Sequence, residues 1–130
     1  MTERSDAPPA RTIFALSSGP GPSGVAVIRL SGPEAGAALT ALAGRLPPPR
    51  LATLARLRDP AGDLLDEALV LYFPEGASFT GEEVVELQVH GGRAVVRAVL
   101  KVLTEMPGLR FAVPGEFARR AFDNGRLDLP

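Results

Sequence analysis

The chain has 130 residues, enough for one domain with its own core, and its 45% hydrophobic content excludes an intrinsically disordered protein. Its 14 basic and 15 acidic residues give a formal net charge of −1, which argues against a broad nucleic-acid-binding surface. Cysteine is absent, which excludes disulfides and thiolate chemistry, and no apolar run reaches the length of a membrane span or secretory signal. We therefore expect a cytoplasmic protein with no membrane partner.

The first half of the chain predicts a tail, two strands and one helix. In chain order these are a polar, proline-rich flexible tail over residues 1–11, a strand at Thr12–Leu16, a loop at Ser17–Gly24, a strand at Val25–Leu30 and a helix from Ser31–Glu34 to about Leu42. Val25–Leu30 is apolar on both faces, which predicts a buried central strand. Pro33 and Glu34 suit a first helical turn, and Gly44 should end the helix.

The second half predicts more strands than helices. Its predicted elements are strands at Leu51–Arg58 and Ala68–Phe73 joined as a hairpin, a strand at Val84–His90, a helix at Gly92–Glu105, a short strand at Arg110–Val113 and a helix at Gly115–Asn124 closed by Gly125. Because strands and helices are interspersed and a hairpin is present, we expect an α+β fold. It should have a mixed sheet of about five to six strands, about three helices and one domain over residues 12–130.

The predicted helix at Gly92–Glu105 is amphipathic. Its apolar face is expected to consist of Val95, Val96, Val99, Leu100 and Leu103. Arg93, Arg97 and Lys101 follow the opposite face, as a solvated surface or, alternatively, as a track for phosphates.

The glycine-rich loop at Gly19–Gly24 matches the pattern G-x-G-x-x-G. A dinucleotide site needs such a loop to open a helix whose amino end holds the pyrophosphate, but here the loop leads into a predicted strand. Two variable positions are also prolines, which lack a backbone donor. The motif therefore predicts a turn between two strands, or a loop lying over a ligand, and not a Rossmann site.

The stretch Ser78–Gly92 is the most informative in the chain. At the two-residue period of a strand, its polar side chains share one face and its apolar ones the other. The polar face is Glu86, Gln88 and His90, and the apolar face is Val85, Leu87 and Val89. Gly91 and Gly92 leave the strand just before a helix, where free backbone amides can bind an anion or a polar ring.

Arg29 and His90 are the two other residues that need an explanation. Arg29 lies on a strand that otherwise looks buried, so it emerges at the strand end, pairs with an acid such as Glu86, or contacts a ligand. His90 is the only histidine, and without cysteines a zinc site is not expected. Hydrogen bonding at the strand-to-helix turn is the predicted role of His90. No serine–histidine–aspartate pattern is present, so no catalytic residue is assigned.

Three segments carry a resemblance to a known family. They are TIFALSSGPGPSGVAVIRLSG, LDEALVLYFPEGASFTGEEVVELQVHGG and PGEFARRAFDNGRLDL, and together they cover essentially Thr12–Leu129 in order. The chain resembles the amino-terminal domain of the MnmE/TrmE tRNA modification GTPases. The resemblance implies a fold similar to the tetrahydrofolate-binding domain of aminomethyltransferases. It also implies binding of 5-formyl- or 5,10-methylene-tetrahydrofolate and formation of a homodimer.

Carried over from that family, the folate contacts fall on Arg29, Glu86 and Arg126. The residue types suit the ligand. A pterin presents an adjacent ring N–H and amine, which one carboxylate such as Glu86 can accept, and arginines can hold the carboxylates of the glutamyl tail. The family's glycine loop commonly has a basic residue where this chain has Pro22, so a tail contact from that position is not expected.

The family also has a helical domain, a G domain that binds GTP, Mg and K, and a carboxy-terminal cysteine motif. None of these is in the chain, so it resembles an excised or truncated amino-terminal domain that should not be catalytic alone. Through the full-length protein, the resemblance implies tRNA and the FAD-dependent MnmG (GidA) as partners in modification of the wobble uridine. A structural and dimerisation module with little folate affinity is the alternative, and a standalone one-carbon transferase is disfavoured because no acid or base is poised for chemistry.

Overall fold

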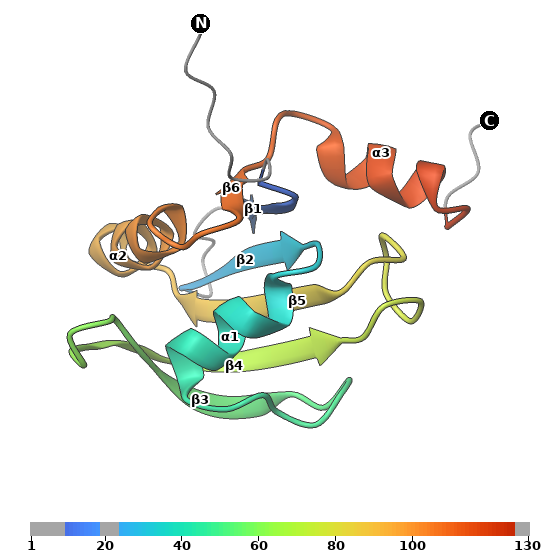
Figure 1. The fold of residues 1–130 in the computed structure, drawn as a ribbon. Coiled ribbons are helices and arrows are strands. Elements are labelled where there is room, and N and C mark those ends of the chain that lie inside the picture. Colours follow the sequence, from blue (N-terminus) through green and yellow to red (C-terminus); the bar gives the residue numbers. More distant parts are fainter. Residues whose placement is uncertain (1–9, 19–23, 127–130) are drawn as a thin grey trace, which may run out of the picture.

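The structure, a computed structural model, describes residues 10–18 and 24–126. Its elements, in chain order, are β1 (Thr12–Ser18), β2 (Val25–Ser31), α1 (Ala35–Ala43), β3 (Thr53–Arg58), β4 (Leu64–Phe73), β5 (Val84–His90), α2 (Arg93–Thr104), β6 (Leu109–Phe111) and α3 (Glu116–Asp123) (Figure 1). Residues 1–9 of the predicted tail (residues 1–11) and the centre of the glycine-rich loop, residues 19–23, lie outside the described residues.

The strands form one mixed sheet in the order β3-β4-β5-β2-β1-β6. All neighbouring pairs are antiparallel except β1 and β6, which are parallel. The six strands and three helices of the described residues confirm the predicted α+β class, and the predicted hairpin forms between β3 and β4. No helix in the described part of the chain is long and apolar enough to span a bilayer.

One face of the sheet is covered by α1 and α2, which both pack on it (Figure 1). A single hydrophobic cluster joins these two helices to the alternate residues of the strands that point toward them. Its strand residues include Phe14, Ala26, Ile28, Leu30, Val70, Val85, Leu87 and Val89, and its helix residues include Leu39, Leu42, Val96, Val99, Val102 and Leu103. Val102 was not predicted in the apolar face of α2.

The opposite face, which we call the open face, has no cover from α1 or α2. Directly opposed residues of neighbouring strands share a face, so the register defines two cross-strand rows on it. The first row is Leu54, Leu69, Gln88 and Val27, and the second is Leu71, Glu86, Arg29 and Ala15. Leu54 is 62% exposed and Leu69 42%, so large apolar side chains lie bare on this face.

Several element boundaries differ from the predicted ones. β1 continues through Ser17 and Ser18, which were expected in the loop, and β2 includes Ser31, so α1 begins later than predicted. β4 begins at Leu64 because it pairs with β3 around a tight turn. The expectation that β2 is buried on both faces was wrong: its burial alternates, because only the face toward the helices is covered.

α3 lies apart from α1 and α2, at the end of the sheet where β1 begins and β2 ends (Figure 1). Glu116 in its first turn accepts two hydrogen bonds from Arg110 of β6, at 2.9 and 2.6 Å, and one from the Val113 backbone N–H at 3.0 Å. These contacts lower the pKa of Glu116 to about 2, the Arg110 hydrogen bonds being the main cause. The ion pair ties α3 to β6 at the sheet edge.

The lowered pKa of Glu116 predicts a loss of stability in acid. Its contribution should be present above the unfolded pKa of 4.5 and should fade as the pH falls from there toward 2. We expect Glu116→Gln to lower the free energy of unfolding near neutral pH by about 1–3 kcal/mol, and the difference from the unsubstituted chain to shrink as the solution is acidified. Urea unfolding over this pH range measures both quantities. Asp123→Asn on the same helix, which breaks a longer and exposed ion pair with Arg119, should change stability by less than about 0.5 kcal/mol. A constant Glu116→Gln effect at all pH values would contradict the prediction.

Candidate functional site

The side chains of Arg29 and Glu86 meet on the open face. They are opposed residues of β2 and β5, and the Arg29 Nη2 donates to Glu86 Oε2 at 2.9 Å. Of the three readings left open for Arg29, the structure therefore shows the pairing with Glu86. The side chains are 31% and 21% exposed, so both groups remain open to solvent and to a ligand. Glu86 Oε1 has no hydrogen-bond partner among the described residues, so it can still accept hydrogen bonds.

The ion pair lines a cavity of about 310 Å³. Besides Arg29 and Glu86, it is lined by Phe73 at the end of β4, by Ala77, Ser78 and Phe79 of the following loop, and by Val84. Two aromatic rings therefore accompany one carboxylate and one guanidinium. Such a mixture suits a flat, polar heteroaromatic ring, whose faces can contact the phenyl groups while its edge bonds to the carboxylate.

Arg126 lies next to this cavity but does not contact the other two predicted residues. It follows α3, and its Nε donates to the backbone carbonyl of Ser78, a cavity-lining residue, at 3.2 Å. Its methylene groups pack against Gly81, where a Cβ would come within 3.2 Å of Arg126 Cγ and 2.9 Å of Asn124 Cβ. Since Gly81 has φ of 84°, glycine permits both the turn and this close approach.

His90 makes hydrogen bonds at the end of β5, as predicted, and its partner is Asp66 of β4. Its ring Nδ1 lies 2.8 Å from Asp66 Oδ1, and its backbone N–H donates to Asp66 Oδ2. The described residues contain no group of three histidine, aspartate or glutamate side chains that could hold a metal ion. The basic row Arg93, Arg97 and Lys101 is exposed, as predicted for a solvated surface, and Lys101 pairs with Glu105 at 3.0 Å.

Gly24 leads directly into β2, so the glycine-rich loop precedes a strand, as predicted, and not a helix. Pro22 lies outside the described residues.

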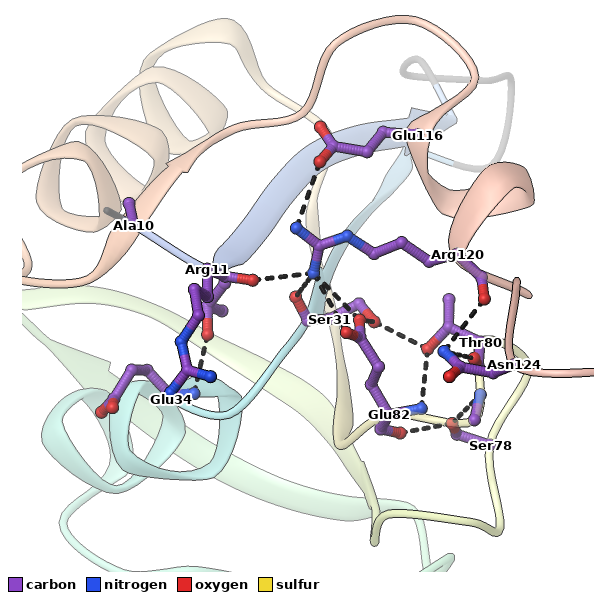
Figure 2. A network of polar contacts seen from close by, with 12 residues as sticks. Ala10, Arg11, Ser31, Glu34, Ser78, Thr80, Glu82, Glu116, Arg120 and Asn124 are labelled. Carbon is purple, nitrogen blue, oxygen red and sulfur yellow. Dashed lines mark hydrogen bonds and ion pairs between the residues drawn. The ribbon is translucent and has the colours of Figure 1, made fainter. Parts of the chain in front are cut away.

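The aromatic walls of the cavity and the polar contacts that hold α3 were not predicted from the sequence. Phe79 belongs to the stretch Ser78–Gly92, so the sequence did show an aromatic residue shortly before the polar face of that strand. Phe73 could be placed only by the register of β4 against β5. The α3 contacts centre on Arg120 (Figure 2), and no local pattern distinguishes it from the neighbouring Arg119.

The fold and cavity define an α+β domain with an ion-paired, aromatic-walled site on the helix-free face of its sheet. A family profile described as "GTP-binding protein TrmE N-terminus" matches residues 12–126, so the chain belongs to this family. It is 62% identical over 122 residues to a tRNA modification GTPase MnmE from Bradyrhizobium sp. (strain ORS 278), covering 94% of this chain and 28% of the relative. It is 64% identical over 118 residues to the protein of that name from Rhizobium meliloti (strain 1021), covering 91% of this chain and 27% of the relative. The chain thus spans less than a third of the length of these relatives and corresponds to their amino-terminal domain.

Proposed function

We propose that this domain binds a reduced one-carbon folate at the Arg29–Glu86 cavity and dimerises through the open face. In the longer protein, it would support modification of the tRNA wobble uridine together with the FAD-dependent MnmG. The observation that carries the proposal is the Arg29–Glu86 ion pair on the floor of an aromatic-walled cavity.

The charges of the cavity fit the two ends of a folate. The Glu86 carboxylate can accept the paired N–H groups of the pterin edge, while Phe73 and Phe79 contact the ring faces. Arg29, released in part from Glu86, and Arg126, which contacts the cavity-lining Ser78, supply cations for the glutamyl carboxylates. None of these residues is an acid or base placed to transfer the one-carbon group. The domain is therefore proposed to bind the cofactor without catalysing its reaction.

The open face supports the dimerisation part of the proposal. Leu54 and Leu69 lie bare in one cross-strand row, and the row next to it contains Glu86 and Arg29. An apolar surface of this kind is suited to a second copy of the chain. A dimer formed there would place its interface beside the cavity.

The direct test is titration of the chain with 5-formyl-tetrahydrofolate, a stable analogue of the methylene form, by isothermal calorimetry. We expect saturable binding of one folate per chain. Inorganic phosphate at the same ionic strength is the control for general attraction to the arginines. The absence of saturable heat for the folate would contradict the proposal.

A structural and dimerisation module with little folate affinity is the second candidate. The observation favouring it is that Arg29 already pairs with Glu86 in the structure, so the pair can serve as an internal contact between β2 and β5. This candidate predicts that the chain dimerises but that a folate titration gives no saturable heat. The same experiment therefore distinguishes the two functions.

A further inference from the structure

Arg120 is the centre of the polar network that seats α3 on the sheet (Figure 2). Its side chain is only 16% exposed, although Arg119 beside it projects into solvent. The Nη1 donates to Glu82 Oε1 at 3.0 Å, to the Arg11 carbonyl at 2.7 Å and to the Ser31 carbonyl at 3.4 Å, while Nη2 donates to Glu116 Oε2 at 3.1 Å. One planar guanidinium thus joins α3 to the start of β1, the end of β2 and the loop before β5.

The same network holds the loop between β4 and β5. Ser31 Oγ lies 2.7 Å from Thr80 Oγ1 and donates to Glu82 Oε1 at 2.8 Å. Asn124 at the end of α3 donates from Nδ2 to the Thr80 carbonyl at 2.9 Å, and Ser78 Oγ donates to the Glu82 carbonyl. The loop that supplies Ser78 and Phe79 to the cavity is therefore bonded to α3 at two points, Thr80 to Asn124 and Glu82 to Arg120.

Arg126 is carried by this assembly. Its backbone N–H donates to the Ala121 carbonyl at 2.7 Å, and its side chain reaches the Ser78 carbonyl. The first contact lies within the end of α3, so Arg126 moves with the helix, and the second contact is lost if α3 moves away from the loop. Arg120 supplies the charge-assisted bonds that hold the helix in place.

Resting on the proposed function, we propose that Arg120 is a positioning residue that sets the affinity for folate by holding Arg126 against Ser78, beside the cavity. Arg120 does not line the cavity. Its replacement would leave Glu82 and Glu116 without this partner and would free the end of α3, so Arg126 would lose its fixed position relative to Ser78. The pterin contacts of Glu86, which sit on the rigid sheet, would be retained.

A double-mutant cycle tests this coupling. The dissociation constant for 5-formyl-tetrahydrofolate is measured by calorimetry for the unsubstituted chain, Arg120→Gln, Arg126→Gln and the double variant. We expect each single variant to bind roughly five- to thirtyfold more weakly. The double variant should lie within about twofold of Arg126→Gln, because a misplaced Arg126 and an absent one are equivalent. Arg119→Gln, on the exposed side of the same helix turn, is the matched control and should bind like the unsubstituted chain.

A second ligand separates a positioning role from general damage to the fold. 5-Formyl-tetrahydropteroate, which lacks the glutamate, should bind Arg120→Gln and the unsubstituted chain equally. The positioning role alone would be overturned if the fold-losses in affinity of the two single variants multiply in the double variant. An equal loss of affinity for both ligands would also overturn it. Failure of the unsubstituted chain to bind folate would overturn the proposed function and this role with it. If thermal unfolding shows that Arg120→Gln does not fold, Arg120→Lys, which retains the charge but cannot bridge all four acceptors, replaces it in the cycle with the same expected coupling.

Discussion

Replacing Glu86 by glutamine is expected to weaken binding of 5-formyl-tetrahydrofolate by about 1–3 kcal/mol, or roughly 5- to 150-fold. A carboxylate can accept both N–H groups of the pterin edge, whereas an amide presents one acceptor and one donor. The substituted side chain would therefore set a donor against a donor inside a partly buried cavity. Calorimetric titration of the two proteins measures the difference directly.

Folding should survive this substitution. The Arg29–Glu86 pair is partly exposed, so its loss is expected to cost no more than about 1 kcal/mol of stability. Glu105→Gln, which breaks the exposed pair with Lys101 on α2, is the matched control and should leave the affinity unchanged. Equal folate affinity in folded Glu86→Gln and in the unsubstituted chain would remove Glu86 from the site.

Substitution of Leu69 by glutamate is expected to convert the proposed dimer to a monomer. In an interface with two-fold symmetry the change occurs twice, and each new carboxylate would have to leave water opposite apolar side chains. The expected cost is about 3 kcal/mol or more, which is a hundredfold or greater loss in dimer affinity. Light scattering at micromolar concentration should fall from about twice the chain mass of 13.6 kDa to the mass of one chain.

Leu46→Glu provides the control for this result. Leu46 is as exposed as Leu69 but lies in the loop after α1, which packs on the other side of the sheet. It should leave the dimer intact. A monomeric unsubstituted chain across a hundredfold range of concentration, or a Leu69→Glu chain that still dimerises, would show that the open face is not the interface.

Local pattern in the sequence determined most of the elements. The strand β5 was predicted with its observed bounds, because strict alternation of Val85, Glu86 and Leu87 has no helical equivalent. The end of α1 was predictable because Gly44 can adopt the left-handed conformation that stops a helix, and it has φ of 86°. Amphipathicity identified α2, and three long motifs identified the family resemblance.

Only the tertiary structure decided how these elements meet. Arg29 and Glu86 are 57 residues apart, and their pairing depends on the register of β2 against β5, for which no local signal exists. The sequence of β2 alone likewise could not show which of its faces the helices would leave bare, although the polar face of β5 indicated it. Arg119 and Arg120 are adjacent and chemically identical, and one becomes exposed while the other is held by Glu82 and Glu116. Residues next to each other on a helix point about 100° apart, so only the seating of α3 on the sheet determines which of the two is buried.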